Sequence, residues 1–164
     1  MDRNNIIPPV RIGLLIAIAT LAFGVGMGIV FGIFEDAIKD WINAGIAAHP
    51  SLHDQASSGK IWRYVQRAHF HAAGIGAFTL ILIIITALTD MKDQLKKLTA
   101  ILISLAGLYP FSWFNMFLLG PELGRSAAHH ALSTELFVMI GVGGFLAGLA
   151  LLVLNLLTGN KQTH

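Results

Sequence analysis

Four long runs of apolar residues, separated by short polar segments, dominate the chain. Residues 12–34, 68–89 and 98–121 contain no Asp, Glu, Lys or Arg, and the only such residue in 127–157 is Glu135. A helix needs about 20 apolar residues to cross the hydrocarbon core of a bilayer, and each run is long enough. The pattern therefore predicts an all-α fold, an integral-membrane four-helix bundle that forms a single domain over residues 1–164.

Helical spacing of apolar residues continues outside these runs on one side of the membrane. Ile38, Trp41 and Ile42 follow the first run at the spacing of one helix face. Pro50 then marks a break, and Ser57 or Ser58 is suited to cap the next helix. We expect the helices to extend beyond the bilayer on this side, which we take as the outer one, and to form an amphipathic cap there.

The composition agrees with a membrane protein and narrows the possible chemistry. Hydrophobic residues make up 55% of the chain and charged residues 12%, which is about half the charged share of an average soluble domain. The net charge of +2 gives no indication of a nucleic-acid partner. Because the chain has no cysteine, disulfides, iron–sulfur clusters, cysteine-ligated zinc and covalently attached c-type haem are excluded.

The basic residues favour one orientation. Four spans put both termini and the loop at residues 90–97 on one side of the membrane. The basic residues of that side are Arg3, Arg11, Lys92, Lys96, Lys97 and Lys161, and those of the other side are Lys39, Lys60, Arg63, Arg67 and Arg125. Short loops count most in the positive-inside rule, so the compact lysine cluster in the 90–97 loop favours cytoplasmic termini. We expect a bacterial inner-membrane protein whose first apolar run is an uncleaved span.

Glycines recur at four-residue spacing in two of the runs. Gly24, Gly28 and Gly32 form one ridge, and Gly144 and Gly148 form another. Such ridges let helix backbones approach closely in lipid. They are compatible with ordinary packing inside the bundle, with a homo-oligomer interface or docking to a larger membrane complex, and with room for a flat cofactor.

Four histidines occur as two pairs at the starts of two apolar runs. His69 and His71 lie in the second run, and His129 and His130 lie in the fourth. Because successive spans cross the membrane in opposite directions, the second and fourth spans start on the same side of the membrane. The two histidine pairs are therefore expected at a similar depth. His49 and His53 lie in the loop on that side, while His164 ends the chain.

The faces of the predicted helices suggest a cofactor. At about 100° per residue, His69 and His130 each head a face of small residues, which leaves space for a porphyrin between two helices. The leading hypothesis is a b-type haem with His69 and His130 as axial ligands and His71 and His129 as alternates or as ligands of a second site. Three arginines just outside the histidine level are expected to hold the haem propionates, namely Arg63, Arg67 and Arg125.

Two other interpretations remain open. The same four histidines, helped by Glu135 or by His49 and His53, are also suited to a non-haem copper, zinc or iron site. Alternatively, the chain is a non-catalytic subunit or assembly factor whose histidines are structural. Glu135 is the only acidic residue inside a span, where such groups are costly and usually functional. It is expected to pair with His71, to contact Trp113 or Asn115, or to relay protons.

One motif resembles a known superfamily. The segment Arg67-Ala-His69-Phe-His71-Ala resembles the H-x-H helices of the haem–copper oxidases and nitric oxide reductases, and the His129–His130 pair resembles their H-H pair. In size and layout, the chain also resembles small four-helix b-type cytochromes. The resemblance implies haem ligation by His69 and His71 and a second metal at His129 and His130. The expected role is electron transfer, or haem redox chemistry as an oxidoreductase component, near the outer face of the membrane.

Overall fold

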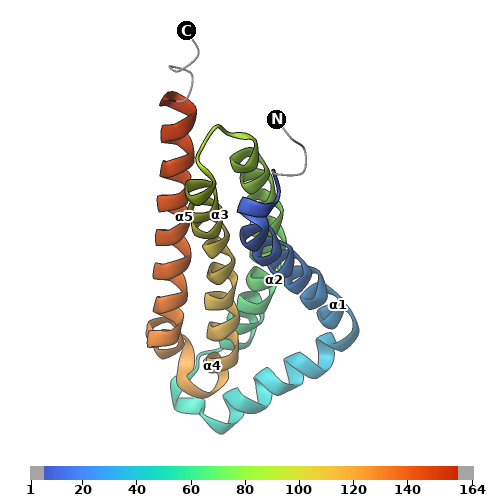
Figure 1. Ribbon diagram of the computed structural model, residues 1–164. Helices are drawn as coiled ribbons and strands as arrows, with labels where there is room; N and C mark the ends of the chain where they lie inside the picture. Colours follow the sequence, from blue (N-terminus) through green and yellow to red (C-terminus); the bar gives the residue numbers. More distant parts are fainter. Residues whose placement is uncertain (1–5, 159–164) are drawn as a thin grey trace.

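The computed structural model describes residues 6–158, which form helices joined by short turns (Figure 1). The long helices are α1 (Arg11–Ala48), α2 (Ser57–Leu88), α3 (Asp93–Ser104), α4 (Tyr109–His130) and α5 (Leu132–Thr158). Short 3-10 turns are η2 (Pro8–Val10), η3 (Pro50–Leu52) and η4 (Leu105–Leu108). Arg3 and Lys161, which entered the charge comparison, and His164 lie outside the described residues.

Four helical segments are long and apolar enough to cross a membrane. They are Pro8–Ala48, Ser57–Leu88, Asp93–His130 and Leu132–Thr158, and the third combines α3, η4 and α4. Helix α1 begins and α5 ends at the same end of the molecule (Figure 1), as an even number of crossings requires. The predicted all-α, four-helix membrane bundle is confirmed.

Helix α1 continues beyond its membrane run, as its apolar spacing predicted. It bends at Phe34, where φ is −119° and ψ is 22°, and the part after the bend runs back across one end of the bundle (Figure 1). There Ile42 is fully buried and packs in a hydrophobic cluster with Ile61 and Val65 of α2. Pro50 lies in η3, just after α1 ends. The second half of α1 therefore closes the end of the bundle opposite the described termini.

The glycine ridges mostly serve packing within the chain. A Cβ on Gly24 would lie 2.5 Å from the backbone nitrogen of Ala73 in α2, so the two helices touch through their backbones. Cβ atoms on Gly144 and Gly148 would meet η4 and α3 at 2.6 Å and 2.7 Å, respectively. Gly32 differs, because a Cβ there would meet nothing within 4 Å. Of the ridge residues, only Gly32 is left open for another use.

The third crossing is interrupted just before Pro110. The interruption is the 3-10 turn η4, and Pro110 follows it in the first turn of α4, where its missing N–H breaks no helical hydrogen bond. Farther on, Gly124 has φ 77° and ψ 160°, a conformation essentially restricted to glycine. Helix α4 therefore changes direction at Gly124, between the apolar runs 98–121 and 127–157.

The junction between α4 and α5 differs from the sequence prediction. We expected one helix over residues 127–157, headed by His129 and His130. Instead, both histidines belong to the end of α4, Ala131 adopts a non-helical φ of −60° and ψ of 134°, and α5 begins at Leu132. Because no single helix runs through residues 130–134, successive residues there are not related by rotations of about 100°. The predicted face of His130, which was derived from those rotations, therefore does not exist.

Candidate functional site

His71 is held in one tautomer by the backbone of its own helix. Its Nδ1 lies 2.8 Å from the carbonyl oxygen of Arg67. Because a carbonyl oxygen can only accept, Nδ1 carries the proton and Nε2 carries the lone pair. The ring centroid lies 5.2 Å from that of Tyr109 and 5.8 Å from that of Trp113. His71 therefore faces α4, with Nε2 able to bind a metal or accept a hydrogen bond.

His69 faces α1 instead. Its Nδ1 donates to the carbonyl oxygen of Gly24 over 2.7 Å, and its ring packs against Phe31. Gly28 leaves space for the ring, since a Cβ there would lie 2.7 Å from Cε1 of His69. Among the described residues, no contact joins His69 to His130, which lies at the α4–α5 junction. The structure therefore does not bring the expected axial pair together.

His129 and His130 lie side by side at the end of α4, with ring centroids 4.8 Å apart. Nδ1 of His130 lies 3.4 Å from Oε1 of Glu135, and the two side chains are 69% and 50% exposed. In one continuous helix, at about 100° per residue, Glu135 would point away from His130. The break at Ala131 instead turns the first turn of α5 back toward the end of α4. Glu135 is thus half exposed at the junction, not buried in the bundle.

Asn115 fixes the same junction from within α4. Its amide nitrogen donates to the hydroxyls of Ser133 and Thr134, each over 2.8 Å, and Thr134 donates to the carbonyl oxygen of Ala128 over 2.8 Å. Thr134 is buried. These bonds hold the start of α5 against α4, so Asn115 has a positioning role in place of the expected contact with Glu135.

The junction borders an apolar pocket of about 330 Å³ between α4 and α5. Its volume lies at the lower end of the roughly 300–1,000 Å³ typical of small-molecule sites. Met139 in its wall is 69% exposed, so the pocket opens on a surface of α5 that faces lipid in a membrane. This α4–α5 pocket is lined by Tyr109, Ser112, Trp113, Met116, His129, Thr134, Glu135, Val138 and Met139.

Trp113 connects this pocket to His71. It lines the pocket, its ring contacts that of His71, and the guanidinium carbon of Arg67 lies 4.7 Å from its ring centroid. Its buried Nε1 has no hydrogen-bond partner in the described part of the chain. A buried donor without an acceptor is costly, so a ligand that brings an acceptor atom to Trp113 would be stabilised there.

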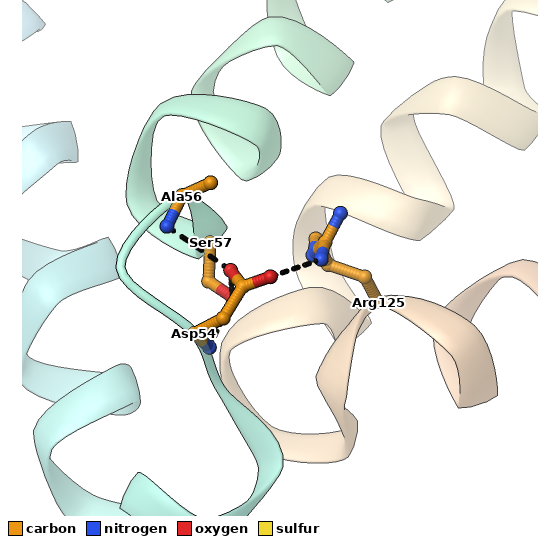
Figure 2. A network of polar contacts seen from close by, with 4 residues as sticks. All are labelled: Asp54, Ala56, Ser57 and Arg125. Carbon is orange, nitrogen blue, oxygen red and sulfur yellow. Dashed lines mark hydrogen bonds and ion pairs between the residues drawn. The ribbon is translucent and has the colours of Figure 1, made fainter.

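Arg125 is engaged elsewhere. Its guanidinium donates to Oδ2 of Asp54 over 2.8 Å, linking the end of α4 to the loop before α2 (Figure 2). The other carboxylate oxygen of Asp54 accepts from the hydroxyl of Ser57 and the N–H of Ala56. The Ser57 hydrogen bond, with the charges of Arg125 and Lys60, lowers the pKa of Asp54 from 3.8 despite opposing desolvation. Arg125 thus fastens a loop to the bundle.

Arg63 and Arg67 line a different pocket from His129. This polar pocket of about 220 Å³, called the basic pocket below, is formed with Lys60 and Tyr64 on α2. Nε of Arg63 donates to the carbonyl oxygen of Gly59 over 3.2 Å. The three arginines proposed for propionates are therefore not gathered at one place, and Arg67 alone lies beside Trp113.

The two loop histidines stand apart from the pairs. Nε2 of His53 donates to the carbonyl oxygen of Pro121 over 2.9 Å, while His49 is exposed at the end of α1. Within residues 6–158, no group of three or more His, Asp or Glu side chains could hold a metal ion. The sequence matches no protein-family model, and no curated protein or solved structure is significantly similar to it.

One buried cation was not singled out by the sequence. Lys96 is only 6% exposed, and its Nζ donates to the carbonyl oxygen of Ala87, near the end of α2, over 2.9 Å. A cation at a helix C-terminus satisfies a carbonyl group that lacks a helical partner. In the sequence, Lys96 is indistinguishable from its exposed neighbour Lys97, so only the fold separates a structural lysine from a surface one.

Proposed function

We propose that the chain is a membrane-embedded b-type haem protein whose cofactor binds at the α4–α5 pocket. The protein ligands in this proposal are His129, from the pocket lining, and His71, across the aromatic pair Tyr109 and Trp113. The observation that carries the proposal is the hydrogen bond from Nδ1 of His71 to the carbonyl oxygen of Arg67. Such bonds orient metal-binding imidazoles and leave Nε2 as the ligand atom.

The donor set fits a haem better than a non-haem metal. A porphyrin supplies four nitrogen ligands, so one or two imidazoles complete the coordination of its iron. A zinc or copper site held by protein alone usually needs three or four ligands, and the described residues offer no group of three. The apolar lining of the pocket also suits the apolar faces of a porphyrin.

Polar residues around the pocket suit the charged edge of the cofactor. The unpartnered N–H of Trp113 can donate to a carboxylate oxygen, and the adjacent Arg67 supplies a positive charge. At the junction, a protonated His130 would form an ion pair with Glu135. Bound haem supplies one-electron redox chemistry, with a potential that its ligands and the surrounding charge adjust. The supported role is therefore electron transfer or haem redox chemistry.

The exposed lysines near the α2–α3 turn support an orientation of the protein in the membrane. Lys92, in the short turn between α2 and α3, and Lys97, near the start of α3, are exposed at the end of the bundle that also holds the start of α1. This favours a bacterial inner-membrane protein with cytoplasmic termini, and a pocket at the periplasmic end.

Haem content tests the proposal. The full chain is produced with a haem precursor, purified in mild detergent and assayed for haem per chain. The proposal predicts stoichiometric haem that is lost or weakened in His129→Ala and retained in His53→Ala, a histidine outside the pocket. Folded protein that takes up no haem would overturn it.

A further inference from the structure

The basic pocket on α2 is a second candidate site, separate from the α4–α5 pocket. Lys60, Arg63, Tyr64 and Arg67 line its volume of about 220 Å³. Carboxylates in residues 6–158 form their ion pairs with Lys39, Arg125 and His130. None of the three pocket cations therefore has a direct acidic partner. Asp54 acts on Lys60 only at a distance, because its oxygens are bonded to Arg125, Ser57 and Ala56.

The position of this pocket along α2 matches the depth of lipid headgroups. The uncharged run begins at residue 68, directly after Arg67, so the pocket lies in the last two turns before the hydrocarbon core. Tyr64 is a residue type enriched at this interface. Anionic headgroups attract basic residues there, with about 1 kcal/mol for each Lys or Arg.

The same face of α2 continues into the membrane as an apolar surface. Lys60, Arg67, Gly74, Ile81 and Leu88 follow one another at seven-residue spacing, which keeps them on one side of the helix within about 20° per step. A Cβ on Gly74 would meet nothing within 4 Å, and Ile81 and Leu88 are 59% and 61% exposed. The cations on this face match the anionic headgroup of a phospholipid, and the apolar positions that follow match its acyl chains.

We propose that the basic pocket binds the phosphate of an anionic phospholipid, with its acyl chain along the Gly74–Ile81 face of α2. Lys60 and Arg63 supply positive charge and N–H donors, and Arg67 adds a third cation while stacking on Trp113. The two proposals share Arg67, but this one does not rest on the haem proposal, because the lipid site needs neither His71 nor His129 and its other two cations, Lys60 and Arg63, lie outside the α4–α5 pocket.

Native mass spectrometry of the full chain, released from nanodiscs of phosphatidylglycerol and phosphatidylcholine in equal amounts, tests the site. We expect the wild type to retain phosphatidylglycerol preferentially. Each lost cation should weaken retention about fivefold, so Lys60→Gln/Arg63→Gln should weaken it on the order of twenty-fivefold while leaving Arg67 on Trp113. A matched double variant on exposed residues at the other end of the bundle, Lys92→Gln/Lys97→Gln, should retain the lipid like the wild type.

Four results would overturn the proposal. They are equal retention of both lipids by the wild type, unchanged retention by folded Lys60→Gln/Arg63→Gln, displacement of phosphatidylglycerol by excess inorganic phosphate, and loss of haem in that variant. The third would assign the pocket to a soluble anion, and the fourth to haem propionates. If the chain binds no haem but still selects phosphatidylglycerol through this pocket, the haem proposal fails and the lipid proposal stands.

Discussion

Nδ1 of His71 donates to the carbonyl oxygen of Arg67, four residues earlier on α2, over 2.8 Å. The bond fixes the tautomer and turns the ring toward Tyr109 and Trp113 of α4. His69, two residues away, makes the equivalent bond to α1. The H-x-H motif thus sends one imidazole to each side of α2, and the ring of His71 contacts Trp113, which lines the same pocket as His129.

Gly124→Ala should destabilise the fold by about 1–3 kcal/mol. Gly124 has φ 77° and ψ 160°, a region that is strained for any residue with a Cβ. The new Cβ would also lie 3.1 Å from the carbonyl oxygen of Leu52. Thermal unfolding in detergent measures the effect, with Gly143→Ala as the control because a Cβ there meets nothing within 4 Å. Equal melting temperatures of the two variants would show that the turn is not as described.

The glycine ridge of α1 gives a second comparison. Gly24→Ala should lower stability, because its Cβ would lie 2.5 Å from the backbone of Ala73 and force α1 and α2 apart. Overpacking of this kind typically costs about 1–3 kcal/mol. Gly32→Ala should be neutral or stabilising, since its site is open and alanine favours helix. Unfolding of both variants is measured in detergent, and a larger loss in Gly32→Ala than in Gly24→Ala would contradict the packing.

Lys96→Met should destabilise the protein by roughly 1.5–3 kcal/mol, the range for a hydrogen bond that involves a charged group. The ammonium group is buried and bonds to Ala87, and methionine keeps the length of the side chain without the donor. Lys97→Met, at an exposed neighbouring position, is the control. The difference in unfolding free energy between the variants is the readout, and a difference near zero would refute the structural role of Lys96.

Asp54 should contribute to stability in a pH-dependent way. Its pKa in the folded protein lies below 3.8, so its contribution is fully present above about pH 4 and is lost as the pH falls through the folded pKa. Asp54→Asn should therefore reduce stability near neutral pH and flatten its decline in acid. Asp90→Asn, at an exposed position outside the described ion pairs, is the control. Parallel acid declines of Asp54→Asn and wild type would contradict the network in Figure 2.

Much of the fold could be predicted because its cause is local. Three charge-free runs and a fourth that contains only Glu135 indicate four crossings, and the spacing of Ile38, Trp41 and Ile42 predicted the continuation of α1. The end of α4 could not be predicted in this way. The break at Ala131 separates two helix-compatible segments without a proline or glycine, and the Asn115–Thr134–Ala128 hydrogen bonds that accompany it form only when α4 and α5 pack together.

For the candidate site, the sequence indicates residue types but not the partners of each side chain. The histidine pairs were recognised by residue type, whereas the choice between His69 and His71 depends on which helix lies on each side of α2. Like Arg63 and Arg67, Arg125 is a cation just before an apolar run. Its partner is nevertheless Asp54, which is distant in the sequence. Long-range partners of this kind leave no periodic signal.

The visible spectrum of the oxidised and dithionite-reduced protein tests the central proposal most directly. We predict a Soret band with sharp reduced α and β bands in the wild type and in His69→Ala. His129→Ala and His71→Ala should each lose these bands or change to the spectrum of a haem that lacks one axial ligand. Folded wild-type protein without haem absorption, or normal bands in both His71→Ala and His129→Ala, would contradict the account.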